Sequence, residues 1–127
     1  MKRLLAVTVI GLLLLAPVFA MAANFTGSIQ GFMCVTQGKV CPVGKEDPVA
    51  AVENVFVLLV DAAKGEYYFL PNLERELLVR HLNQEVKITG TLDKKFKSIK
   101  VSEISMKGKV VWSQAMEDQM RKDLFAD

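Results

Sequence analysis

The chain has 127 residues, of which 16 are lysine or arginine, 14 are aspartate or glutamate, two are cysteine and one is histidine. The small excess of positive charge lies in Lys2 and Arg3, and without them the 16 basic residues become 14, equal to the 14 acidic ones. Such a balance excludes the strongly basic class of nucleic-acid-binding proteins.

The first 22 residues have the pattern of a secretory signal peptide. A basic start at Met1, Lys2 and Arg3 is followed by an apolar run at residues 4–16 and by small residues at 20–22. The apolar run is shorter than the roughly 20 residues that a membrane-spanning helix needs. We therefore predict cleavage before Ala23 and export to the periplasm, or alternatively secretion.

Cys34 and Cys41 both follow the predicted cleavage point. An exported protein with an even number of cysteines usually pairs them, so we predict a structural disulfide. A bridged loop of about eight residues contributes roughly 2.5 kcal/mol in the chain-entropy model. The alternative is thiol–disulfide redox or soft-metal chemistry, because thiolates and thioethers select Cu(I). The candidate thioethers are Met33, Met106, Met116 and Met120.

The N-terminal part of the predicted mature chain contains one strand and one loop. Residues 25–36 are rich in β-branched and aromatic side chains and predict a strand that bends at Gly27 and Gly31. Residues 37–54 contain many glycines and prolines and predict a loop tied by the disulfide, with a short helical turn at 49–52.

A hairpin follows this loop. Residues 55–61 form a nearly continuous apolar run that is too short for a typical helix, which predicts a buried strand. Residues 66–70 predict the second strand, in which alternation places Tyr67 and Tyr68 on opposite faces.

A helix and two further strands come next. Asn72, directly after Pro71, is a good N-cap for a helix that runs to about residue 83. Residues 85–93 and 98–106 alternate between apolar and polar and predict two strands, with a bulge around Ser102 in the second.

The last predicted element is a helix that begins near Ser113, with apolar residues at intervals of four: Met116, Met120 and Leu124. The full order is three strands, a helix, two strands and a helix. This is the order of the OB-fold, a five-stranded Greek-key barrel with a helix between strands 3 and 4. We predict an all-β domain with helices, in three parts: signal peptide (1–22), OB-fold-like domain (23–112), and C-terminal helix and tail (113–127).

Four segments also carry a family resemblance: FTG at 25–27, GEYYF at 65–69, VKITGTLDK at 86–94 and IKVSEI at 99–104. Over roughly residues 24–106 the chain resembles the small exported bacterial OB-fold proteins, the BOF-like proteins of the periplasm. The resemblance implies a non-enzymatic binding or stress-related protein. The loop with the cysteines and the C-terminal helix depart from the family pattern.

The connection between the last two predicted strands is rich in lysine, and in OB-folds this connection borders the binding face. An anionic envelope ligand or an acidic protein would suit such a surface, whereas nucleic acid is not expected outside the cytoplasm. The alternative is a solvated hairpin tip that discourages edge-to-edge pairing. The predicted binding residues are Tyr67, Tyr68, Lys94, Lys95, Phe96 and Lys97.

No catalytic motif is present, and we predict neither catalytic residues, nor a metal site, nor a cofactor. The single histidine, His81, cannot form a metal site alone, and its position between Leu77 and Leu78 on a helical wheel predicts partial burial. The sequence therefore predicts an exported non-enzymatic binding or accessory module. The alternatives are redox or copper chemistry at the cysteines, and a subunit that docks on an envelope complex through its C-terminal helix.

Overall fold

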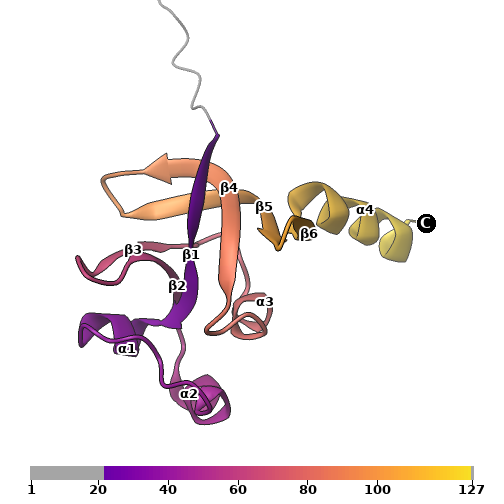
Figure 1. The fold of residues 1–127 in the computed structure, drawn as a ribbon. Coiled ribbons are helices and arrows are strands. Elements are labelled where there is room, and N and C mark those ends of the chain that lie inside the picture. The colour runs from indigo at the N-terminus through magenta and orange to yellow at the C-terminus, as the bar shows by residue number, and fades with distance from the viewer. Residues whose placement is uncertain (1–21, 127) are drawn as a thin grey trace, which may run out of the picture.

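The computed structural model describes residues 22–126, so the predicted signal peptide lies, except for Ala22, outside the described part. Figure 1 shows the arrangement of the strands and helices. In chain order the elements are β1 (Ala23–Gly31), α1 (Phe32–Thr36), α2 (Glu46–Val52), β2 (Phe56–Asp61), β3 (Glu66–Phe69), α3 (Arg75–Val79), β4 (Glu85–Asp93), β5 (Ser98–Met106), β6 (Lys109–Ser113) and α4 (Gln114–Phe125).

The six strands form one sheet that closes on itself. β1 is antiparallel to β2 on one side and to β4 on the other, and the full order is β3-β2-β1-β4-β5-β6. The ring closes where Phe69 of β3 pairs in parallel with Ser98 of β5. β6 is attached to β5 outside the ring. The prediction of a mostly β chain is confirmed, with one strand that the sequence did not indicate.

The main hydrophobic core lies inside this ring. β2 is buried on both faces, because Leu58 joins the main core whereas Val57 and Leu59 join a smaller cluster with Val35 of α1. This double burial explains the continuous apolar run of the predicted buried strand. The main core consists of Ile29, Cys41, Phe56, Leu58, Leu70, Leu73, Leu78, Leu82, Val86, Ile88, Ile99, Val101 and Ile104.

β4 and β5 approach closely at Gly90. A Cβ at this position would collide with the carbonyl of Lys100, so the strand pair depends on a residue without a side chain. The register shifts between Thr89 and Gly90, which leaves Ser102 as the extra residue of β5. The predicted bulge is therefore confirmed.

β1 ends earlier than the sequence predicted. The prediction extended the strand to residue 36, but β1 stops at Gly31 and α1 follows. The first amide of α1 donates to the Val55 carbonyl at 2.9 Å, and the second donates to the Glu53 carboxylate at 2.8 Å. These partners are distant in sequence, and they satisfy helix amides that would otherwise lack acceptors.

α3 is also shorter than predicted, since it covers only Arg75–Val79 instead of residues 72–83. Asn72 does not cap it, because its side chain donates to and accepts from the backbone of Val101, both at 2.8 Å. Beyond the helix, Asn83 has a left-handed φ of 63° and donates its N–H to the Ile29 carbonyl at 2.9 Å. At both ends of the predicted helix, hydrogen bonds to distant residues thus take the place of helical hydrogen bonds.

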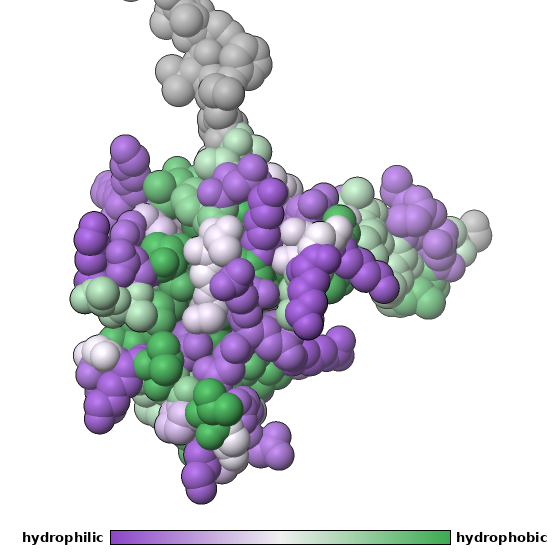
Figure 2. Space-filling view, in the orientation of Figure 1, coloured by the Kyte–Doolittle hydropathy of each residue, from purple (hydrophilic) through white to green (hydrophobic). Residues whose placement is uncertain are grey.

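α4 begins where the sequence predicted. The hydroxyl of Ser113 accepts the N–H of Met116 at 3.1 Å, which is the expected N-cap interaction. The helix projects from the barrel, and hydrophobic side chains are visible on it (Figures 1 and 2). No helix in the described part of the chain has the length and apolar character needed to cross a membrane.

We expect Gly90→Ala to lower the free energy of unfolding by about 1–3 kcal/mol, because the new methyl group would push β4 away from β5. Thr26→Ala, at an exposed position of β1, is the control and should change the free energy of unfolding by less than about 0.5 kcal/mol. Urea unfolding followed by circular dichroism measures both. Equal stability of the two variants would contradict the close approach.

Candidate functional site

The first candidate site is a group of aromatic side chains on the outside of the barrel. Alternation along β3 places Tyr67 and Phe69 on one face, where Phe32 of α1 meets both. The ring centroids lie 6.0 Å apart for Phe32 and Tyr67, 5.6 Å for Phe32 and Phe69, and 5.7 Å for Tyr67 and Phe69. All three are partly buried against Val35, Val57 and Leu59, so the cluster is anchored from below.

The turn between β4 and β5 reaches this cluster. The carbonyl of Lys97 accepts the N–H of Phe69 at 2.8 Å, which fixes the end of the turn to β3. The Lys97 ammonium lies 4.1 Å from the centroid of the Tyr67 ring, within cation–π range. We call the group of Phe32, Tyr67, Phe69 and Lys97 the aromatic–lysine surface.

The other lysines of the turn are exposed. The Asp93 carboxylate accepts the N–H groups of Lys95 and Phe96 at 3.0 and 3.3 Å, which shapes the turn. The Lys95 ammonium lies 5.3 Å from the centroid of the exposed Phe96 ring. Lys94 is exposed beside them. The turn therefore presents several positive charges next to the aromatic–lysine surface.

Tyr68, which the sequence also placed in the site, points elsewhere. Its ring centroid lies 5.8 Å from that of Phe25, and the side chain packs against the main core. Its hydroxyl donates to the Glu66 carboxylate at 2.6 Å, and this hydrogen bond raises the pKa of Tyr68. The structure thus brings Tyr67 and Lys97 together but separates Tyr68 from them.

The predicted set of binding residues did not include Phe32 or Phe69. Residue 32 was expected in the first strand, and only the helical conformation of α1 brings its ring onto β3. Alternation along β3 places Phe69 on the same face as Tyr67, so the sequence pattern indicates that both rings belong to one surface.

The second candidate is the loop with the two cysteines. Cys34 and Cys41 form a disulfide, as predicted, with their Cα atoms 5.3 Å apart. Cys41 is fully buried, and its sulfur accepts the N–H of Gly31 at 3.2 Å. Its own N–H donates to the side-chain oxygen of Gln30 at 2.6 Å. These contacts attach the bridged loop to β1.

Gln30 and Glu53 are the buried polar side chains of this region, with exposed fractions of 2% and 4%. The amide nitrogen of Gln30 donates to Ser28 at 3.1 Å and to Asn83 at 3.0 Å. Asn83 donates in turn to the carboxylate of Glu46 in α2 at 2.8 Å, which lowers the pKa of that carboxyl group. The network joins the loop, β1 and the segment before β4.

The Glu53 carboxylate accepts hydrogen bonds from the backbone. One oxygen accepts the N–H of Met33 at 2.8 Å and the other accepts the N–H of Val55 at 3.0 Å. Arg75 contacts the Glu53 carbonyl at 2.9 and 3.0 Å and also donates to the carbonyl of Ala50. Both carboxylate oxygens have backbone donors, so the geometry favours a structural role over acid–base chemistry.

The soft-metal alternative finds little support in the arrangement. Both sulfurs of the cysteines are in the bridge, so such chemistry would require the reduced chain. Met116 and Met120 lie on α4, well apart from the cysteine loop in Figure 1. Within residues 22–126 no group of three or more His, Cys, Asp or Glu residues could hold a metal ion. His81 is half-buried, as predicted, and its Nδ1 lies 3.2 Å from the Gln84 side-chain oxygen.

Glu53→Gln should destabilise the fold by about 1–3 kcal/mol. The NH₂ group of the new side chain would face the backbone N–H of Met33 or Val55, and that N–H would lose its acceptor. Glu85→Gln, at an exposed position, is the matched control and should change stability by less than about 0.5 kcal/mol. Urea unfolding distinguishes the two. An unchanged free energy of unfolding in Glu53→Gln would argue against the hydrogen bonds from the backbone to this carboxylate.

Thiol titration of the native protein should detect no free cysteine, and denaturant with reductant should release both. Replacement of Cys34 and Cys41 together by alanine should lower the free energy of unfolding by roughly 2–3 kcal/mol, because the unfolded loop gains conformational freedom. A bridge that is readily reduced in the native state would instead favour the redox alternative.

Comparison with protein-family models, with curated proteins and with solved structures gave no match for this chain.

Proposed function

We propose that the chain is an exported, non-enzymatic binding module of the bacterial envelope, built on an OB-fold barrel. The ring order β1-β2-β3-β5-β4, the parallel pairing of β3 with β5, and the position of α3 between β3 and β4 all support this fold. β6, α4 and the cysteine loop are additions to the barrel. The disulfide supports an oxidising compartment, as export to the periplasm would provide.

The aromatic–lysine surface is the proposed binding face. In an OB-fold, ligands bind on strands 2 and 3 between the loop that joins strands 1 and 2 and the loop that joins strands 4 and 5. Here Phe32 comes from the first of these loops, Tyr67 and Phe69 come from β3, and Lys97 comes from the second.

The observation that carries the proposal is the position of the Lys97 ammonium 4.1 Å from the Tyr67 ring. An apolar ring and a positive charge at one place can contact a flat ligand and its negative group together. Lys94 and Lys95 extend the positive charge along the exposed turn. An anionic ligand with an apolar face, such as an acidic polysaccharide of the envelope, fits this combination best.

Polygalacturonate, an acidic polysaccharide, is a suitable probe for this face, with neutral dextran for comparison. We expect the protein to bind the former in preference to the latter. The double substitution Lys95→Gln with Lys97→Gln should weaken binding of polygalacturonate about tenfold or more, because it removes the charge beside Tyr67 and a second charge on the same turn. Isothermal titration calorimetry measures the affinity.

The matched control is Lys107→Gln with Lys109→Gln, which removes the same charge from the turn after β5 and from the first residue of β6. This pair should leave the affinity nearly unchanged. Equal weakening by both pairs would indicate attraction to net charge without a defined site. The absence of any binding to polygalacturonate by the unsubstituted protein would refute the proposed ligand class.

A further inference from the structure

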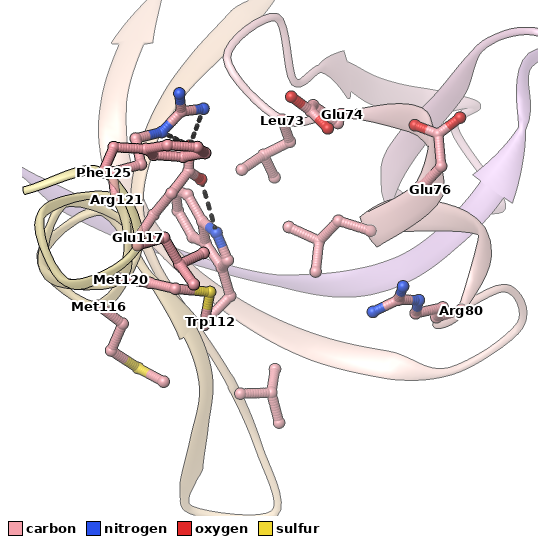
Figure 3. A pocket seen from close by; sticks show the side chains of 13 residues that line it. Leu73, Glu74, Glu76, Arg80, Trp112, Met116, Glu117, Met120, Arg121 and Phe125 are labelled. Carbon is pink, nitrogen blue, oxygen red and sulfur yellow. Dashed lines mark hydrogen bonds and ion pairs between the residues drawn. The ribbon is translucent and has the colours of Figure 1, made fainter.

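A second surface lies between α4 and the barrel. It is an open groove of about 540 Å³, seen from close by in Figure 3. Leu73, Leu77 and Trp112 line it on the barrel side, and Met116 and Met120 line it on α4. Both walls are therefore mainly apolar.

The α4 wall of the groove is not covered in a single copy of the chain. The exposed fractions are 51% for Met116, 61% for Met120 and 68% for Leu124, and they rise as the helix leaves the barrel. Among the described residues of α4 none is buried. An exposed apolar surface of this kind is typical of an interaction site. A small-molecule pocket would enclose most of its ligand, which a groove with such exposed walls does not.

Specific contacts hold α4 in this position. The Trp112 indole N–H donates to the Glu117 carboxylate at 3.1 Å, and Arg121 pairs with the same carboxylate at 2.9 Å (Figure 3). The Trp112 contact and the Ser113 cap join the helix to β6, whereas the Arg121–Glu117 pair lies within α4 itself. The groove is therefore a built feature of the fold.

The charges around the groove match those of α4 itself. At 100° per residue, Arg121 and Asp123 lie on opposite sides of the apolar stripe that contains Met120. The barrel rim carries two carboxylates and one guanidinium, from Glu74, Glu76 and Arg80. Within residues 22–126 the only ion pair is the one between Arg121 and Glu117, so these three rim charges lack ion-pair partners. In an incoming α4, Asp123 would supply a carboxylate for Arg80. Arg121 has guanidinium donors beyond those that contact Glu117, and these would face Glu74 and Glu76.

A membrane fits this helix less well than a protein does. Interfacial helices carry lysine and arginine on their polar side, whereas the polar side of α4 has Asp118 as well as Lys122. The predicted mature chain has equal numbers of acidic and basic residues, so two copies do not repel each other through net charge.

We propose that the occupant of the groove is α4 of a second copy of this chain, in a symmetric dimer. The apolar stripe of each α4 covers the groove of the other copy. The same contact between stripe and groove therefore forms twice, as a twofold interface requires. The stripe of Met116, Met120 and Leu124 supplies the apolar contact, and the flanking charges fix its register. This proposal is independent of ligand binding at the aromatic–lysine surface.

Sedimentation equilibrium on the chain purified after export tests the dimer. We expect a concentration-dependent equilibrium between monomer and dimer, and Leu124→Glu should raise its dissociation constant about tenfold or more. Met120→Glu should have the same effect. Ala115→Glu places the same charge on the opposite side of α4 and should leave the constant within about twofold.

Leu124 and Met120 are largely exposed in one copy, so neither substitution should disturb folding, and unchanged circular dichroism spectra would verify this. An unsubstituted chain that remains monomeric up to millimolar concentration would overturn the proposal and assign the groove to a different protein. A dimer that persists in both Leu124→Glu and Met120→Glu would overturn it as well, because the contact would then lie elsewhere.

Discussion

The pairing of β3 with the start of β5 is the constraint on which the rest of the structure depends. The N–H of Phe69 donates to the Lys97 carbonyl, and Phe69 pairs in parallel with Ser98. Without this contact the strands would form an open sheet with two unpaired edges. The closed ring instead encloses the main core. The same contact carries the turn between β4 and β5 onto β3, which sets the Lys97 ammonium over the Tyr67 ring.

The cysteine loop forms a second layer that hydrogen bonds hold on the barrel. Gln30 reaches Cys41 and Asn83, while Glu53 accepts two backbone N–H groups near the ends of the loop. Buried polar groups are costly unless they are paired, and no described buried side-chain nitrogen or oxygen lacks a partner. The disulfide constrains the unfolded loop, and the network specifies one folded position for it. α1 is thereby placed where Phe32 can complete the aromatic–lysine surface.

The aromatic–lysine surface and the α4 groove differ in chemistry and in place. Figure 1 shows β3 and α4 on different sides of the barrel. Contact between two α4 helices would leave both aromatic–lysine surfaces accessible. In the proposed dimer, two sites of modest affinity could act together on a polymeric anionic ligand, since the second contact is intramolecular once the first has formed. The two proposals are thus compatible although neither requires the other.

Local patterns in the sequence determined the type of most elements. The apolar run before Asp61, the alternation in β4, the bulge at Ser102 and the Ser113 cap depend on side-chain spacing along the chain, so they could be predicted. The pairing of Cys34 with Cys41 followed from their number and the predicted compartment. In the candidate site, the lysines of the turn and Tyr67 were recognisable for the same reason.

Tertiary structure alone decided where elements end and which side chains meet. α1 forms because Val55 and Glu53 accept its first amides, and Asn72 leaves the predicted helix because Val101 offers it two backbone hydrogen bonds. The position of the Phe32 ring on Tyr67 and Phe69 follows from the packing of α1 on the barrel. The sequence predicts that α4 has an apolar stripe, but the exposure of this stripe follows from the way in which the folded helix projects from the barrel. Contacts between residues distant in sequence leave no periodic signal along the chain, which is why only the folded structure reveals them.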